Sequence, residues 1–214
     1  MSVDLALYLV TDAVIATRAG HRLPDLVAAA VAGGVTAVQV REKHAPARAF
    51  LDTVLAVAAA TPPHVPVIVN DRVDVYLAAR AAGAAVSGVH LGQSDLPASI
   101  ARTLIGPEGI IGVSVSTDAE MREASAHADY LGIGPFRATS TKPDAAHPLG
   151  AGATGRLADV STLPVVAIGG ITATDAAVLR AAGVSGIAVV SAICGAADPS
   201  AAAVALRSAW EAGR

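Results

Sequence analysis

Three side chains suited to binding an anion occupy alternate positions of one short segment. Gln39, Arg41 and Lys43 belong to the run Gln-Val-Arg-Glu-Lys, which continues an apolar stretch that begins at Ala37. Alternate residues of an extended strand point to the same face, so an amide, a guanidinium and an ammonium are expected on one side. Such a set can bind a phosphate or a diphosphate. A strand end that is merely solvated is the alternative.

Two carboxylates follow later apolar segments in a similar way. Asp71 comes directly after Val65–Asn70, and Asp95 comes shortly after Gly88–Leu91. Mg²⁺ is held in proteins by one or two carboxylates, and waters and substrate phosphates complete its shell. A diphosphate joined to both carboxylates by Mg²⁺, beside the basic residues, is therefore electrostatically coherent. The alternative is that each aspartate only caps the helix that follows it.

A second anion site is predicted where the last two apolar segments end. Gly169 and Gly170 follow Pro164–Ile168, and Ser191 follows Gly186–Val190. Small residues at these ends allow backbone N–H groups to approach a phosphate. A tight turn without a ligand is the alternative for the glycine pair.

The longest break between predicted elements, residues 135–153, carries Thr139, Ser140, Thr141 and Lys142. It is too polar for a core and longer than a minimal connection, which predicts a functional lid over both anion sites. A variable surface insertion is the alternative. Lys43 and Lys142 are the two lysines among 15 basic residues, which suggests a role for each that arginine does not fill.

Short apolar segments alternate with Ala/Leu-rich segments along the whole chain, which predicts a parallel sheet covered by helices. The predicted strands are Leu7–Thr11, Ala37–Arg41, Val65–Asn70, Gly88–Leu91, Ile110–Ser114, Tyr130–Gly134, Pro164–Ile168 and Gly186–Val190. The predicted helices are Leu23–Ala32, Pro46–Ala60, Asp74–Ala82, Leu96–Leu104, Asp118–Ala126, Thr154–Asp159, Thr174–Ala182 and Ser200–Ala212. Eight such units predict an α/β fold, a single (β/α)8 TIM barrel spanning residues 1–214 as one domain. An open doubly wound sheet is the alternative.

The amino-acid composition argues against several classes of protein. Hydrophobic residues make up 53% of the chain, which excludes disorder, and a net charge of −3 argues against ordinary nucleic-acid binding. No uninterrupted apolar run suits a membrane span, and the N-terminus is predicted to be a strand, not a signal peptide. Cys194 is the single cysteine, so no disulfide is expected. We therefore expect a cytoplasmic protein with small-molecule partners, whose oligomeric state stays open.

Jointly, these motifs resemble those of the thiamine-phosphate synthase (thiamine-phosphate pyrophosphorylase) family, in family order and along nearly the whole chain. The matching stretches are Gln39–Lys43, Val69–Asp71, Gly88–Asp95, Gly112–Ser114, Gly132–Pro135, Thr139–Lys142, Val166–Ile171 and Val189–Ile193. The resemblance implies a (β/α)8 barrel that joins hydroxymethylpyrimidine diphosphate to a thiazole phosphate. The products would be thiamine monophosphate and pyrophosphate, formed by a dissociative reaction assisted by Mg²⁺.

The resemblance also implies a role for each matching residue. The pyrimidine diphosphate would be held by Gln39, Arg41, Glu42, Lys43, Asn70, Ser114 and Lys142, among which Arg41, Lys43 and Lys142 would stabilise the leaving group. Mg²⁺ would be held by Asp71 and Asp95. The thiazole phosphate would be held by Thr139, Ser140, Thr141, Gly170, Val190 and Ser191.

Two departures from the family pattern stand out. The segment 81–87 is longer than usual, and Arg137 takes a place where the family usually has an aromatic residue. For His90 two interpretations stay open, a structural histidine or a residue of the barrel mouth. Tyr130 is predicted to pack in the core.

Three other functions compete with synthesis of thiamine phosphate. They are a thiazole tautomerase of the same superfamily, an isomerase that needs a single phosphate site, and a non-catalytic regulator of the pathway. The joint presence of basic, amide and acidic residues favours the synthase.

Overall fold

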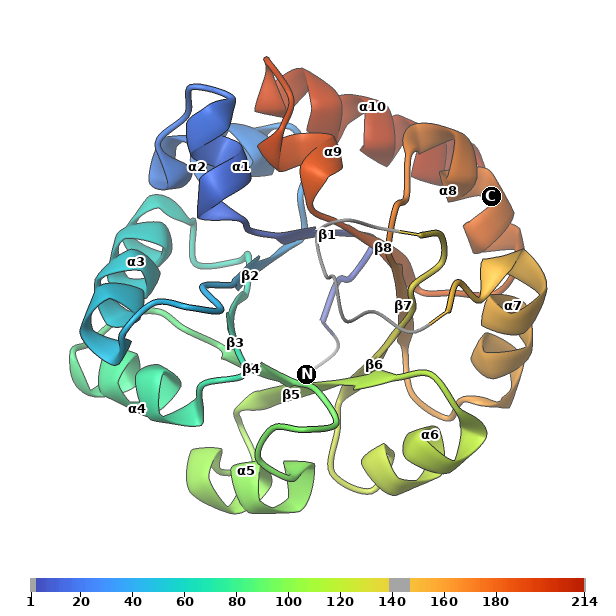
Figure 1. Ribbon diagram of the computed structural model, residues 1–214, viewed down its shortest axis with the longest axis horizontal. Helices are drawn as coiled ribbons and strands as arrows, with labels where there is room; N and C mark the ends of the chain where they lie inside the picture. The colour runs from blue at the N-terminus through green and yellow to red at the C-terminus, as the bar shows by residue number, and fades with distance from the viewer. Residues whose placement is uncertain (1–2, 139–146, 214) are drawn as a thin grey trace.

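The computed structural model describes residues 3–138 and 147–213, and its eight parallel strands close into a barrel in chain order (Figure 1). The strands are β1 (Leu7–Val10), β2 (Ala37–Val40), β3 (Val67–Asn70), β4 (Gly88–Leu91), β5 (Ile110–Val115), β6 (Tyr130–Ile133), β7 (Val165–Ile168) and β8 (Gly186–Val189). The last strand pairs with the first, since Leu7 lies opposite Ile187. The predicted TIM barrel is confirmed, and the open sheet is wrong.

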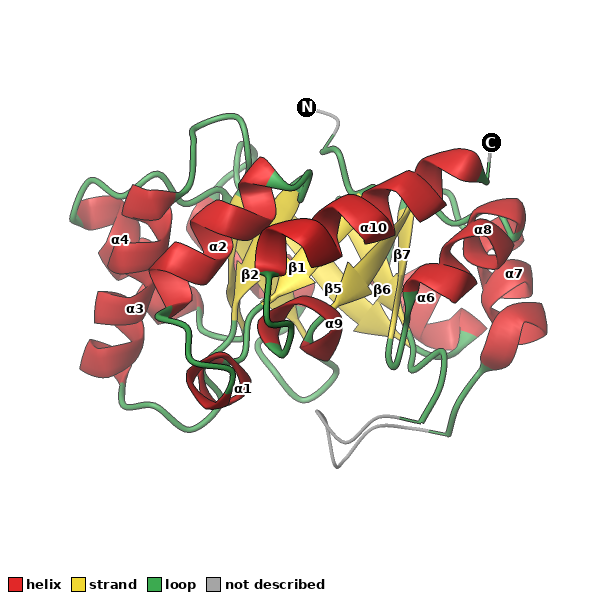
Figure 2. Cartoon of the chain, turned by 90° about the horizontal axis from the view of Figure 1, so that it is seen from above, coloured by secondary structure: helices red, strands yellow, loops and turns green. Residues whose placement is uncertain are grey.

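Helices form a ring around the barrel (Figure 1). They are α1 (Ala13–Arg18), α2 (Leu23–Ala32), α3 (Ala47–Ala60), α4 (Val73–Ala81), α5 (Ala98–Ile105), α6 (Asp118–Ala124), α7 (Gly150–Val160), α8 (Ala173–Ala181), α9 (Ser191–Cys194) and α10 (Pro199–Ala212). All eight predicted helices are present, and the short helices α1 and α9 are additional. In Figure 2 both lie on the same side of the barrel, directly after β1 and β8. Within the described residues, no helix is long and apolar enough to cross a membrane.

Apolar side chains fill two regions, one between the strands and the helices and one inside the barrel. Leu7 and Leu9 of β1 belong to the outer region, whereas Tyr8 and Val10 belong to the inner one. Alternation along a strand thus sends one set of residues to each region. Both sets are buried, which explains why the strands read as continuous apolar runs.

Local signals in the sequence account for several of the helix ends. Thr117 and Glu120 form a capping box at the start of α6. Gly83 and Gly183 have φ of +82° and +83° after α4 and α8, as expected for left-handed residues at helix ends. After α2 the left-handed residue is Gly34, with φ of +108°, and not Gly33, which directly follows the helix with φ of −81°.

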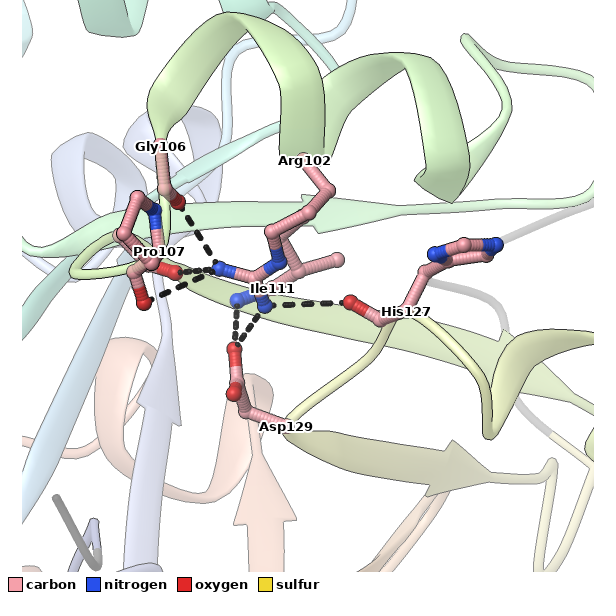
Figure 3. A network of polar contacts seen from close by, with 7 residues as sticks. Arg102, Gly106, Pro107, Ile111, His127 and Asp129 are labelled. Carbon is pink, nitrogen blue, oxygen red and sulfur yellow. Dashed lines mark hydrogen bonds and ion pairs between the residues drawn. The ribbon is translucent and has the colours of Figure 1, made fainter.

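A polar network ties together the segments that enter β5 and β6 (Figure 3). The Arg102 guanidinium of α5 donates to the carbonyl of Gly109 at 2.5 Å and to the carboxylate of Asp129 at 2.6 Å. The same carboxylate accepts from the backbone N–H of Ile111 at 2.7 Å. Gly109 and Asp129 immediately precede the two strands, so this network belongs to the N-terminal end of the barrel, where residues of TIM barrels serve stability.

Candidate functional site

A cavity of about 400 Å³ opens among the C-terminal ends of the strands. All eight strands contribute to its lining, and so do the loops after β2, β3, β4, β7 and β8. The cavity is lined by ten of the predicted binding residues, namely Gln39, Arg41, Lys43, Asn70, Asp71, Asp95, Ser114, Gly170, Val190 and Ser191. Its size suits a small-molecule ligand.

Alternation at the end of β2 directs one set of residues into the cavity. Gln39, Arg41 and Lys43 line it, whereas Val40 packs among the buried residues between strands and helices. The backbone N–H of Arg41 donates to the Thr11 hydroxyl at 3.0 Å, which fixes this strand end against the end of β1. An amide and two cationic side chains therefore meet in one wall of the cavity.

Glu42 is a predicted binding residue that the structure places outside the cavity lining. Its atom Oε1 is buried and has no hydrogen-bond partner in the described part of the chain. Burial raises the pKa of this carboxyl group, the charge of Asp12 raises it further, and the charge of Arg41 opposes both. The structure thus does not bring Glu42 together with the other residues of its run.

Asp71 and Asp95 face one another in the cavity. The backbone N–H of Asp71 donates to the carbonyl of His90 at 2.8 Å, and Asp95 accepts from the backbone N–H of Gly92 at 2.7 Å. Burial, a hydrogen bond with Asp95 and the charge of Asp95 raise the pKa of Asp71 to about 6. The two carboxyl groups are close enough that ionisation of one disfavours ionisation of the other.

Neither aspartate caps a helix. The residue that precedes α4 is Arg72, and the residue that precedes α5 is Pro97. The alternative of simple N-caps is therefore wrong. No group of three or more His, Cys, Asp or Glu side chains that could hold a metal ion occurs among the described residues. Two facing carboxylates nevertheless fit Mg²⁺, which takes its remaining ligands from water and substrate phosphates.

The glycine pair after β7 lies under the segment that follows β6. Gly169 and Gly170 have φ of +107° and +61°. A Cβ atom at Gly169 would lie 2.7 Å from Pro135 Cα, and one at Gly170 would lie 3.0 Å from the Ala138 carbonyl oxygen. The N–H of Arg137 donates to the Gly169 carbonyl at 3.0 Å. Close chain approach therefore requires both glycines, and both also line the cavity.

Helix α9 begins at Ser191, beside the glycine pair. Val190 precedes it as the N-cap residue, and both Val190 and Ser191 line the cavity. Loops after strands 7 and 8 with a short extra helix are the common phosphate site of TIM barrels. The geometry of this wall thus suits a phosphate.

Arg137 does not line the cavity. Its guanidinium lies 5.7 Å from the centre of the Phe136 ring and forms an ion pair with the buried Asp175, which caps α8. The arginine therefore ties the segment after β6 to α8. Among the other predicted residues, Thr139, Ser140, Thr141 and Lys142 lie outside the described residues.

The cavity contains residues that sequence reasoning placed elsewhere or missed. Tyr8 and Tyr130 line its floor, together with His90. His90 is buried and also faces the cavity, so both interpretations of this histidine hold. Tyr130 packs in the barrel interior as predicted, but its hydroxyl group also bonds to Tyr8 and His90. The alternation of inner and outer residues in β1 was the one signal that could have pointed to Tyr8.

Comparisons with known proteins agree with one another. A family model described as thiamine monophosphate synthase matches residues 7–193. A curated thiamine-phosphate synthase from Albidiferax ferrireducens is 48% identical over 205 residues, which cover 95% of this chain and 90% of that protein. One from Chloroflexus aurantiacus is 47% identical over 208 residues, covering 96% and 93%. The solved structure of a thiamine phosphate pyrophosphorylase from Pyrococcus furiosus superposes with a TM-score of 0.86 at 36% identity, covering 99% of this chain and 98% of that one. The chain therefore belongs to the thiamine monophosphate synthase family of enzymes.

Proposed function

We propose that this enzyme condenses 4-amino-2-methyl-5-(diphosphooxymethyl)pyrimidine with a thiazole phosphate, giving thiamine monophosphate and pyrophosphate. One observation carries the proposal beyond family membership: a single cavity has two walls suited to anions. One wall has Gln39, Arg41 and Lys43 beside the carboxylate pair, and the other has the glycine turn and the start of α9. A reaction between two phosphorylated substrates needs both.

The diphosphate is assigned to the first wall. Arg41 and Lys43 supply positive charge there, and the amides of Gln39 and Asn70 and the hydroxyl of Ser114 supply directional hydrogen bonds. Lys142 is assigned to the same group by the family resemblance alone. The thiazole phosphate is assigned to Gly170, Val190 and Ser191, with Thr139, Ser140 and Thr141 added on the same ground.

Mg²⁺ is assigned to Asp71 and Asp95. The proximity of their carboxyl groups, which raises the pKa of Asp71, supports this assignment because one cation could contact both. A bound Mg²⁺ would neutralise the pair and the oxygens of the diphosphate, which favours departure of pyrophosphate.

The reaction is proposed to be dissociative. The bond between the pyrimidine methylene carbon and the diphosphate oxygen breaks, and its electron pair leaves with pyrophosphate. The ring amino group stabilises the resulting cation, and the lone pair of the thiazole nitrogen then forms the new C–N bond. The protein positions both reactants, while Arg41 and Lys43 stabilise the negative charge that develops on the leaving group.

The competing functions leave parts of this cavity unexplained. A thiazole tautomerase or another phosphate isomerase has use for one anion site, not for a cationic wall beside a carboxylate pair. A non-catalytic regulator has no need of metal-binding carboxylates. The proposed synthase reaction uses all of these groups.

The test is incubation of the purified protein with both substrates, with and without Mg²⁺, followed by measurement of pyrophosphate and thiamine phosphate. We expect equal amounts of both products, formed only with Mg²⁺. The double variant D71N/D95N should lose turnover by about 100-fold or more while keeping its circular dichroism spectrum. Absence of thiamine phosphate from the wild-type reaction, or unchanged turnover by the double variant, would overturn the proposal.

A further inference from the structure

A chain of hydrogen bonds crosses the floor of the cavity from Gln39 to Ser114. Gln39 Nε2 lies 3.0 Å from the Tyr8 hydroxyl, and that hydroxyl lies 2.8 Å from the hydroxyl of Tyr130. The Tyr130 hydroxyl lies 2.9 Å from His90 Nδ1, and His90 Nε2 lies 2.9 Å from Ser114 Oγ. Five residues from five strands are thus connected, and both ends of the chain are residues assigned above to the pyrimidine diphosphate.

Two glycines make room for the middle of this chain. A Cβ atom at Gly112 of β5 would lie 2.3 Å from the Tyr130 hydroxyl and 2.5 Å from His90 Nδ1. A Cβ atom at Gly132 of β6 would lie 3.1 Å from His90 Cε1. Any larger residue at Gly112 would therefore displace the bond between Tyr130 and His90.

Ring packing holds the same groups in place. The rings of Tyr8 and Tyr130 meet edge to face with 5.9 Å between their centres, and those of Tyr130 and His90 lie 5.5 Å apart. Burial raises the pKa of both tyrosine hydroxyls above its usual value, so both keep their protons at neutral pH. The two tyrosines are therefore neutral donors and acceptors held in fixed positions.

The Gln39 amide is the group in this chain whose donor role is fixed, and the directions of the other bonds are assigned from it. A side-chain amide nitrogen only donates, so the Tyr8 hydroxyl accepts from Gln39. The other group bonded to the buried Tyr8 hydroxyl is the hydroxyl of Tyr130, and we assign the Tyr8 proton to it so that this proton has an acceptor. Tyr130 then donates to His90 Nδ1. A neutral imidazole that accepts at Nδ1 carries its proton at Nε2, so His90 donates to Ser114. The proton of Ser114 is left for another acceptor, and Ser114 lines the cavity.

We infer that Tyr8, Tyr130 and His90 are positioning residues that keep the Ser114 hydroxyl a hydrogen-bond donor toward the bound pyrimidine diphosphate. Ser114 then selects an acceptor atom, such as an anionic phosphate oxygen. The reversed chain would present a lone pair at Ser114 and repel an anion. This inference rests on the proposed function, which assigns the ligand.

The test is a double-mutant cycle between Tyr130→Phe and Ser114→Ala. Calorimetry would measure the Kd of the pyrimidine diphosphate with Mg²⁺ and without the thiazole phosphate, so that no turnover occurs. We expect Tyr130→Phe to weaken binding about tenfold with Ser114 present and less than twofold in the Ser114→Ala protein, because the tyrosine acts through the serine.

Tyr76→Phe is the matched control. Tyr76 is equally buried, lies in α4 outside the barrel, and its hydroxyl accepts from Arg80 at 3.3 Å. We expect this variant to bind within twofold of the wild type. Equal weakening by Tyr130→Phe in both backgrounds, or no more weakening than in Tyr76→Phe, would overturn the inference.

A second measurement needs no substitution. The ¹⁵N chemical shifts of His90 in the wild-type protein should show a neutral ring with its proton on Nε2. A proton on Nδ1 would reverse the chain and overturn the inference even if the Tyr130 variant failed to fold.

The two proposals fail in different ways. Wild-type protein that makes thiamine phosphate but gives an additive cycle overturns only the inference. Protein that binds the diphosphate with a coupled cycle but makes no product overturns only the proposed function. Protein that does not bind the diphosphate overturns both.

Discussion

Asp71 carries both backbone strain and electrostatic strain. Its φ of +60° is left-handed, and it is the only residue other than glycine with positive φ among the described residues. Its carboxyl group is partly buried and lies against that of Asp95. Such strain concentrates at functional sites, where a ligand relieves part of it. We therefore expect stability of the metal-free protein to depend on this one side chain.

Asp71→Asn should stabilise the metal-free protein above pH 6. The pKa of Asp71 is raised from 3.8 to about 6, so the folded state holds this proton more tightly than the unfolded state. The stabilising effect of the protonated group is complete below about pH 4 and is lost as pH rises through 6. Asparagine has no such loss and also tolerates left-handed backbone.

Melting temperatures at pH 5 and pH 8, with and without Mg²⁺, check this prediction. Wild-type protein should melt lower than the variant at pH 8 without metal, and Mg²⁺ should raise the melting temperature of the wild type alone. Equal responses of the two proteins to pH and to Mg²⁺ would contradict it.

At the scale of elements, the strands could be predicted closely and the two short helices could not. The eight strands are apolar runs separated by helical runs of ordinary length, so alternation alone reveals them. Helices α1 and α9 have six and four residues, too few to show a helical period. The helix α7 begins at Gly150, four residues before its predicted start, because glycines at its beginning obscured it.

The site was predictable only where a motif is local. Gln39, Arg41 and Lys43 share a face through simple alternation, and their place in the cavity follows from it. The link between Tyr8 and Tyr130 joins β1 to β6, which are not neighbours in the barrel. No spacing along the chain reports such a contact, since it depends on closure of the whole barrel.

The glycine turn after β7 gives a prediction at this scale. Gly170→Ala would place a methyl group 3.0 Å from the Ala138 carbonyl in a backbone region that alanine disfavours. We expect a KM for the thiazole phosphate raised roughly tenfold, with the KM for the pyrimidine diphosphate little changed, because strain of about 1–3 kcal/mol must distort this wall.

Gly20→Ala is the control, because it introduces the same kind of backbone strain without a steric contact near the cavity. Gly20 has φ of +87° after α1, and a Cβ atom there meets nothing within 4 Å. This variant should lose roughly 1 kcal/mol of stability without a change in either KM. Steady-state kinetics of both variants test the prediction. An unchanged KM for the thiazole phosphate in Gly170→Ala would contradict it.

At the scale of the whole molecule, binding and stability occupy opposite ends of the barrel. The cavity lies at the C-terminal strand ends, and the Arg102 network lies where β5 and β6 begin (Figure 3). No side chain of that network lines the cavity. Changes at one end should therefore leave the other largely unaffected.

Arg102→Ala tests this separation. It removes the donors to Gly109 and Asp129 and leaves polar groups without their partner, so we expect a loss of about 1–3 kcal/mol in the free energy of unfolding. Both KM values and kcat at 25 °C should stay within twofold of the wild type. Urea denaturation and steady-state kinetics provide the measurements.

Arg22→Ala is the control, since Arg22 and Asp25 form an ion pair at 3.6 Å whose side chains are 83% and 68% exposed. An exposed pair contributes little, so its loss should go almost unnoticed. If Arg102→Ala lowered stability no more than Arg22→Ala, or changed catalysis by tenfold, the separation of the two ends would be wrong.

The pairing of β1 with β8 has a consequence for how the chain is made. These strands come from opposite ends of the sequence, and Leu7 finds its partner only when Ile187 has been synthesised. Until then β1 and β7 both present unpaired backbone edges, which are prone to association with other chains. Closure over so long a separation also slows folding. A nascent chain released from the ribosome before Gly186 would thus be an open sheet prone to aggregation, and β8 is the strand that removes both free edges.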